Sequence, residues 1–301
     1  MSVSTLRLPD CPEDLDDAQV TQFYRDGYLA FENVLTAEEV EAGRMALSEI
    51  TWRLMDEARE GRARVRKAKA GTKGNYAGTQ VQEADGPFGI HFESSVEEPL
   101  ALENAEAELK FRKLYGYHQA HPTFQSLVAH PRIKGFVERL LGQKVILKNE
   151  MALSKPPFIG SEKPWHQDNA YFDWLPLEAI ATAWITLDDA TVENGCMHVL
   201  SGRHKGEAFK HVHKIDCQIV EGRLDYSDAV PVEMKAGGAM IFSAMLPHQT
   251  PPNRSPHGRR ALQFQYRGEN TRQVSREEFG KVFAEADGSP ATCALAEQVD
   301  G

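Results

Sequence analysis

Residues 164–174 read PWHQDNAYFDW and residues 242–253 read FSAMLPHQTPPN, and these two stretches decide the fold. The first places His166 two residues before Asp168, and the second adds the remote His248. Two histidines and one carboxylate are the ligand set that suits a non-haem Fe(II) oxygenase, because this set leaves coordination positions open. The pattern therefore predicts an iron site.

The flanking sequence favours a true ligand set over a chance His-x-Asp pair. In a chain with 11 histidines, such a pair arises by chance roughly as often as not. A Pro- and Gly-containing loop precedes the pair, and alternation over residues 182–187 predicts a strand after it. His248 follows the apolar run 239–242, and a small β-barrel gathers ligands so placed at one rim. The competing His91 and Glu93 have no such downstream partner.

Helical patterns come first along the chain and strand patterns follow. Residues 16–27 predict a short helix that ends at Gly27, and residues 28–35 predict a strand. Thr36 and Glu39 form a capping box for a long helix. That helix carries apolar residues on one face, and they are Val40, Leu47, Ile50 and Leu54.

The rest of the chain predicts an α+β, mainly β protein with a β-sandwich or barrel core. Further patterns predict a strand within 108–119, helices within 123–141 broken near Pro131, a strand at 145–153, short strands up to 267 and a helix at 276–284. We expect one domain over residues 1–301, with 1–15 and 271–301 peripheral or partly disordered. The basic residues 62–78 are typical of a solvated loop or lid rather than of a phosphate-binding patch.

The charge, apolar content and cysteine positions of the chain exclude some classes of function. The formal charge of −10 argues against a nucleic-acid or anionic-membrane partner. The sequence has no apolar run of membrane-helix length and no signal-peptide pattern, so we expect a cytoplasmic protein with a small-molecule substrate. The oligomeric state stays open. Four scattered cysteines predict neither a disulfide framework nor a zinc site.

Several segments resemble the phytanoyl-CoA dioxygenase family of Fe(II)/2-oxoglutarate oxygenases. They are KPWHQDNAYFDW (163–174), AWITLDDATVENGCMHVLSGRHKG (183–206), AGGAMIFSAMLPHQTPPNRS (236–255) and RRALQFQYRG (259–268), and FYRDGYLAFENVLTAEEV (23–40) resembles the family's N-terminus. The resemblance runs from about residue 21 to residue 268. It implies a double-stranded β-helix (a cupin-like jelly-roll) with the N-terminal helices packed on the outer sheet.

The resemblance also implies roles for single residues. His166, Asp168 and His248 would bind Fe(II), leaving three positions for 2-oxoglutarate and O2. Arg259 would bind the far carboxylate of 2-oxoglutarate, which a planar guanidinium matches well. Arg260 competes with it, since only one of two successive strand residues faces the interior. Periodicity leaves both open, and the family register favours Arg259.

Further co-substrate contacts follow from the same resemblance. Thr250 would donate its hydroxyl to the far carboxylate, Trp184 would wall the pocket, and Met151 and Lys113 would reach it. Ordinary strand packing is the alternative for each, and placing Lys113 needs a one-residue gap. Among the histidines outside the triad, His91 is a candidate substrate contact, whereas His211 and His213 are expected in a surface loop.

The expected activity is Fe(II)/2-oxoglutarate-dependent oxidation of a small organic metabolite, most simply hydroxylation of an unactivated C–H bond. The intact Asp168 favours this over halogenation. Two alternatives stay open: a catalytically silent metal-binding scaffold or sensor of the same fold, and a non-redox cupin-type metal enzyme. Arg259, Thr250 and Trp184 argue against a scaffold, and cupins usually carry more histidine ligands. An acyl-CoA substrate is disfavoured, because only the loop 62–73 is basic.

Overall fold

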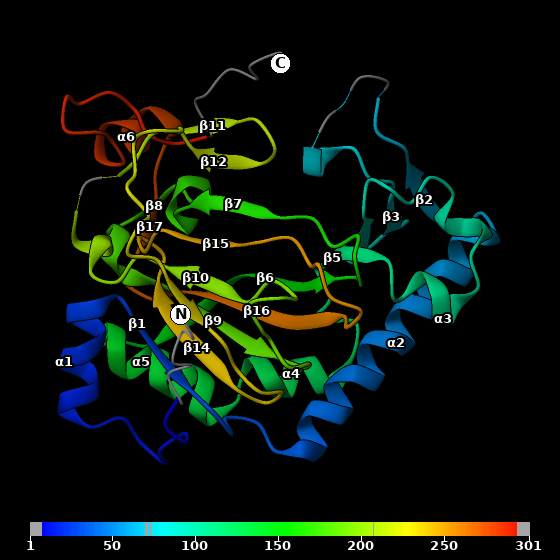
Figure 1. Ribbon diagram of the computed structural model, residues 1–301, viewed down its shortest axis with the longest axis horizontal. Coiled ribbons are helices and arrows are strands. Elements are labelled where there is room, and N and C mark those ends of the chain that lie inside the picture. Colours follow the sequence, from blue (N-terminus) through cyan, green and yellow to red (C-terminus); the bar gives the residue numbers. More distant parts are fainter. Residues whose placement is uncertain (1–7, 70–71, 73, 207, 294–301) are drawn as a thin grey trace.

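Two antiparallel sheets form the centre of the molecule in a computed structural model that describes residues 8–69, 72, 74–206 and 208–293 (Figure 1). The larger, nine-stranded sheet has the order β1 (Tyr28–Phe31), β14 (Ala239–Ser243), β9 (Ile180–Thr186), β16 (Arg259–Gly268), β6 (Val145–Lys155), β5 (Phe111–Tyr115), β4 (Gly89–Phe92), β3 (Gln80–Glu83) and β2 (Ala63–Arg66). The four-stranded sheet has the order β13 (Val230–Val232), β10 (Met197–Val199), β15 (His248–Thr250) and β7 (Lys163–His166). Two further pairs are β11 (His211–His213) with β12 (Cys217–Ile219) and β17 (Arg272–Gln273) with β8 (Trp174–Leu175).

The two larger sheets pack face to face, as the predicted jelly-roll requires. Trp184 and Met240 of the nine-stranded sheet share one buried cluster with Met197, Val199 and Val232 of the four-stranded sheet. Such sheet-on-sheet packing leaves the opposite face of each sheet to be covered by other elements.

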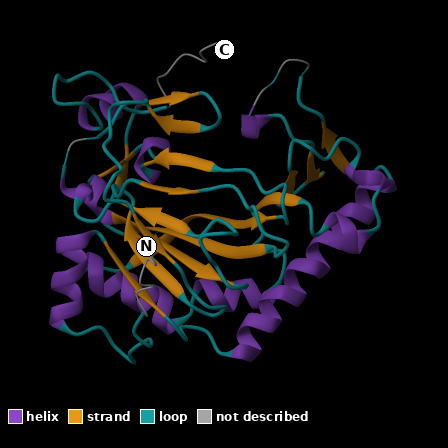
Figure 2. Ribbon diagram, in the orientation of Figure 1, coloured by secondary structure: helices purple, strands orange, loops and turns teal. Residues whose placement is uncertain are grey.

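Helices cover the outer face of the nine-stranded sheet (Figure 2). These helices are α1 (Asp17–Asp26), α2 (Ala37–Arg59), α3 (Asn104–Ala107), α4 (Pro122–Val128) and α5 (Phe136–Leu141), whereas α6 (Arg276–Val282) lies near the β11–β12 hairpin. The capping box of Thr36 and Glu39 is confirmed at the start of α2. Leu47, Ile50 and Leu54 of this helix share the main core with Phe264 of β16. The N-terminal helices thus pack on the outer sheet, as predicted.

Short helical turns complete the chain between these elements. They are η1 (Gly74–Tyr76), η2 (Pro99–Ala101), η3 (Pro131–Gly135), η4 (Asp168–Tyr171), η5 (Leu177–Ala179) and η6 (Arg203–Lys205). The predicted break near Pro131 is a single π-helical turn between α4 and α5. In the described part of the chain, no helix combines the length and apolar character needed to cross a membrane.

Alternation along β16 separates the two neighbouring arginines. Arg259 is buried on the inner face, whereas Arg260 forms an ion pair with Asp188, with Nε 2.8 Å from Oδ2. Leu262 and Phe264, which share the face of Arg260, lie in the helix-covered core. The apolar face of this strand is therefore the outer one, and the polar face points between the sheets.

The structure adds detail to one prediction about the first part of the chain and corrects another. Residues 8–15 are ordered: the Cys11 amide donates to the Glu32 carbonyl (2.8 Å), and Leu15 is buried. Within the predicted basic loop, Ala63–Arg66 is instead the edge strand β2. Its exposed arginines hid the pattern of a strand, although charged side chains are common on edge strands. Residues 70, 71 and 73 of the same loop lie outside the described residues.

Two predictions about the second half are also wrong. Cys217 and Cys293 form a disulfide across 76 residues, and no motif spacing signals such a distant pair. His211 lies buried on β11 rather than in a surface loop. Its Nε2 accepts a hydrogen bond from the Gln167 amide (3.0 Å). The carboxyl-terminal segment also covers this hairpin, since the His211 amide donates to the Ala291 carbonyl (2.9 Å).

Phe264→Ala tests the helix-covered core. Phe264 is fully buried, so the substitution is expected to lower the free energy of unfolding by about 3–5 kcal/mol. Chemical denaturation measures the change. Ile146→Ala on the neighbouring strand β6 is the control, because Ile146 is 44% exposed and should cost less than about 1 kcal/mol. Equal losses in the two variants would contradict the core assignment.

Candidate metal and co-substrate site

The three predicted metal ligands meet between the sheets. His166 ends β7, Asp168 begins η4 and His248 begins β15, where it is the register partner of His166. The Asp168 Oδ1 atom lies 3.5 Å from Nε2 of His166 and 3.7 Å from Nε2 of His248. All three side chains are buried, and their ligand atoms lie within 4.8 Å of one another. In the described part of the chain, no other group of this kind is found.

Both histidines are held in the tautomer that suits a metal. Nδ1 of His166 donates to the Pro164 carbonyl and Nδ1 of His248 to the Leu246 carbonyl, each at 2.9 Å. Burial, together with the neighbouring His166, lowers the pKa of His248 to about 3, so its imidazole is neutral. The two Nε2 atoms that face Asp168 are thereby left with free lone pairs, as metal coordination requires.

Two residues of the larger sheet fix the carboxylate of Asp168. Its Oδ2 atom accepts hydrogen bonds from Thr182 Oγ1 (2.7 Å) and Gln265 Nε2 (2.8 Å). Asn149 in turn donates to the Gln265 side-chain oxygen (2.9 Å). Burial acts to raise the pKa of Asp168, but the two neighbouring histidines and the hydrogen bond from Thr182 outweigh it and hold the pKa below the ordinary value. Oδ1 stays directed at the histidines.

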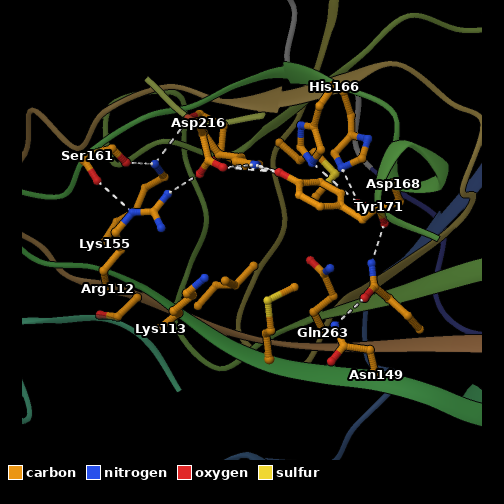
Figure 3. A pocket seen from close by; sticks show the side chains of 18 of the residues that line it. Arg112, Lys113, Asn149, Lys155, Ser161, His166, Asp168, Tyr171, Asp216 and Gln263 are labelled. Carbon is orange, nitrogen blue, oxygen red and sulfur yellow. Dashed lines mark hydrogen bonds and ion pairs between the residues drawn. The ribbon is translucent and has the colours of Figure 1, made fainter. Parts of the chain in front are cut away.

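A cavity of about 330 Å³ opens beside the triad (Figure 3). Of the predicted co-substrate residues, Arg259, Thr250, Met151 and Lys113 line it. Trp184 does not line it and lies instead against Arg259, whose guanidinium carbon is 5.1 Å from the centre of the indole ring. Residues of β5, β6, β15 and β16 thus line the same cavity as the three candidate metal ligands.

Arg259 is a buried cation without a carboxylate partner among the described residues. Its side chain is 1% exposed, and its Nη atoms reach only the carbonyl oxygens of Leu153 (3.5 Å) and Gly195 (3.3 Å). Its Nε atom has no partner within the described chain. Burial lowers the pKa of Arg259 to about 10, which still leaves it charged at neutral pH. A buried guanidinium in this state is suited to an anionic ligand.

A second polar cluster, which the sequence did not reveal, also lines the cavity. Its centre is the buried Asp216, just before Cys217. The side chains around it are Arg112, Lys163, Tyr76, Tyr171 and Asn75. Tyr76 and Asn75 belong to the end of the predicted loop or lid, so this cluster fixes the end of that segment over the cavity.

The remaining candidates lie outside the triad. His91 and Glu93 are buried on and after β4, and they are not joined by a third metal-ligand residue in the described chain. Glu93 accepts the Ser161 amide (2.9 Å), and the pKa of His91 is lowered to about 4 by burial and by Lys113. His91 does not line the cavity, so its substrate contact has no support in this geometry.

Known proteins share this sequence pattern and fold. The sequence profile described as "Phytanoyl-CoA dioxygenase (PhyH)" matches residues 23–261. The chain belongs to the phytanoyl-CoA dioxygenase family. Membership makes it a 2-oxoglutarate-dependent non-haem iron dioxygenase, with Fe(II) as cofactor and 2-oxoglutarate and O2 as co-substrates.

Individual members of the phytanoyl-CoA dioxygenase family and solved structures match this chain over most of its length. Phytanoyl-CoA dioxygenase domain-containing protein 1 of Danio rerio is 26% identical, over 83% of this chain and 89% of its own length. The carbocyclase SnoK from nogalamycin biosynthesis matches with a TM-score of 0.60 at 23% identity, covering 96% of this chain and 97% of its own. EvdO2 of Micromonospora carbonacea var. aurantiaca, solved with 2-oxoglutarate, matches with a TM-score of 0.56 at 24% identity, covering 87% and 94%. At these identities the two structures establish the shared fold.

Arg259→Met tests whether Arg259 is an unpaired buried charge. Removing such a charge is expected to leave the ligand-free protein as stable as before or to stabilise it by about 1–4 kcal/mol. Denaturant unfolding without metal or 2-oxoglutarate measures this. The matched control is Arg260→Met, which leaves Asp188 without its ion-pair partner and should destabilise the protein. The same loss of stability in both variants would contradict the assignment.

Proposed function

We propose that this dioxygenase hydroxylates an unactivated C–H bond of a small organic metabolite. In this reaction O2 places one oxygen atom in the product alcohol and the other in succinate, and 2-oxoglutarate loses CO2. The observation that carries the proposal is the unpaired, buried Arg259 in the same cavity as His166, Asp168 and His248. A metal-binding triad alone fits many proteins, whereas a buried cation beside it fits a second, anionic ligand.

The residues fit Fe(II) and 2-oxoglutarate in distinct places. His166, Asp168 and His248 would hold Fe(II), which supplies the activation of O2 and the oxidising power when bound. Arg259 would receive the far carboxylate of 2-oxoglutarate, assisted by the hydroxyl of Thr250 on β15. The flat face of Trp184 supports the guanidinium from behind. Met151 and Lys113 complete the co-substrate side of the cavity.

The protein's own contribution is to position both reactants and to exclude water. The triad is buried between two sheets, and the Asp216 cluster lines the same cavity. Thr182 and Gln265 hold Asp168 before the metal arrives, so little reorganisation is needed on binding. A closed, preorganised site favours oxidation of the bound substrate over reaction with solvent.

This arrangement argues against the alternative functions. A silent scaffold does not require an anion site such as Arg259, whose burial is unfavourable unless a ligand compensates it. A non-redox cupin-type enzyme also has no need for it. Asp168 fills the position that a halide would need, which favours hydroxylation.

Asp168→Ala tests the proposal directly. Without this carboxylate the two histidines alone should fail to retain Fe(II), and succinate formation from 2-oxoglutarate should fall to the level of the metal-free protein. Succinate is measured by chromatography with Fe(II), 2-oxoglutarate and O2, without a prime substrate and then across a metabolite library. Asp189→Ala, at an exposed ion pair with Lys235, should behave like the wild type. Wild-type turnover by Asp168→Ala would contradict the metal assignment.

Gln265→Ala tests the support of Asp168. Loss of the hydrogen bond to Oδ2 is expected to weaken metal binding by about 10–100-fold. Isothermal titration with Mn(II), a redox-stable substitute for Fe(II), measures the affinity without any turnover. Gln249→Ala, beside His248 but outside the cavity lining, is the control and should bind Mn(II) normally. Unchanged affinity in Gln265→Ala would show that this residue does not orient the ligand.

A further inference from the structure

The cavity carries more positive than negative charge. Its lining includes two carboxylates, Asp168 and Asp216. The cationic side chains in the lining are Arg112, Lys113, Lys155, Lys163 and Arg259. Burial, together with the neighbouring Arg259 and Arg112, lowers the pKa of Lys155 well below its usual value against the opposing effect of Glu93 and Glu162, so Lys155 adds little positive charge.

The ligands of the proposed function, on which this inference rests, do not remove the excess. The two charges of Fe(II) are balanced by Asp168 and by the carboxylate of 2-oxoglutarate next to the metal. The far carboxylate balances either Arg259 or Lys113, and Asp216 balances either Arg112 or Lys163. After this assignment the lining still offers more cationic than anionic groups. Burial lowers the pKa of Lys113 to about 8 and also lowers that of Lys163, so the lysines can relieve part of the excess by losing a proton, whereas the guanidinium of Arg112 stays charged.

Asp216 has no remaining capacity for a further cation. Its Oδ1 atom is contacted by Lys163 (2.9 Å), Tyr171 (3.2 Å) and the Cys217 amide (2.8 Å). A fourth contact to Oδ1 comes from Tyr76 (3.2 Å). Its Oδ2 atom accepts from Arg112 (3.1 Å) and Asn75 (3.2 Å). A substrate ammonium group therefore finds no free carboxylate here, since Asp168 is committed to the triad.

Arg112 keeps a free donor next to this cluster. Its Nε donates to Ser161 Oγ (3.0 Å) and its Nη2 to Asp216, while its Nη1 has no partner in the described chain. The adjacent Lys113 also has no hydrogen-bond or ion-pair partner among the described residues, and both line the same wall (Figure 3). A guanidinium held by two anchors with a third nitrogen free is preorganised to bind an oxyanion.

Tyr171 connects this anion site to the metal ligands. Its ring lies 6.4 Å from the His166 ring, and its hydroxyl contacts Asp216. The cluster therefore lies about one tyrosine side chain from the triad. The cavity volume of about 330 Å³ is at the lower end of the range for small-molecule sites.

We propose that the prime substrate is a small organic acid whose carboxylate binds to Arg112 at the Asp216 cluster. The carbon to be oxidised then extends past Tyr171 towards the metal. A neutral amide of the same shape would lose the charge-assisted hydrogen bonds, and a substrate amine would face an excess of positive charge.

Binding to the protein loaded with Mn(II) and saturating 2-oxoglutarate tests this without turnover. The probes are propionate, hexanoate, phenylacetate and benzoate, each paired with its primary amide, and calorimetry gives the dissociation constants. At least one acid should bind 10-fold or more tightly than its amide in the wild type. Arg112→Gln should bring that ratio close to one. Arg139→Gln is the matched control, because Arg139 is exposed and pairs with the exposed Asp17, and it should keep the wild-type ratio.

The outcomes separate this inference from the proposed function. Failure of 2-oxoglutarate to bind the Mn(II) protein contradicts the proposed function and this inference with it. Normal 2-oxoglutarate binding with amides bound as tightly as every acid overturns the anion site alone. An acid preference that survives in a folded Arg112→Gln variant, with a wild-type thermal transition, overturns the assignment to Arg112. Because the ratio compares two ligands on one protein, partial misfolding does not imitate the expected result.

Discussion

The carboxylate of Asp168 is the interaction that connects the two sheets at the site. Oδ1 faces two histidines of the four-stranded sheet, and Oδ2 is held by Thr182 and Gln265 of the nine-stranded sheet. A buried carboxylate is unfavourable unless its oxygens are satisfied. The sheets must therefore keep the spacing that satisfies both oxygens at once, and the same spacing creates the cavity beside them.

Charge accounts for the rest of the cavity. Arg259 is buried without a carboxylate partner in the described chain, and Arg112 in the lining of the same cavity keeps a free nitrogen beside an already saturated Asp216. Both positions are unfavourable in isolation and become favourable with anionic ligands. We propose that this uncompensated positive charge selects both the co-substrate and the class of substrate.

Local patterns predicted much of the fold and the three candidate metal ligands that the structure brings together. The capping box at Thr36 and the run from residue 239 determined elements directly, and the spacing of His166 and Asp168 pointed to a metal. Arg259 needed the family register, because alternation alone leaves either arginine inside. Gln265 shares the face of Arg259 and could have been found from the period of two, but no sequence feature links it to Asp168.

Other features depend on distant contacts that no local pattern contains. Asp216 meets Arg112 and Tyr76 across 104 and 140 residues, and Cys217 meets Cys293 across 76. The most direct test of the central claim is an anaerobic titration of Fe(II) into the protein with 2-oxoglutarate, followed by visible charge-transfer absorption. We expect a band that saturates at one Fe(II) per chain, because the keto acid chelates iron held by the triad. Absence of the band at saturating Fe(II), or 2-oxoglutarate binding that is independent of metal, would contradict the account.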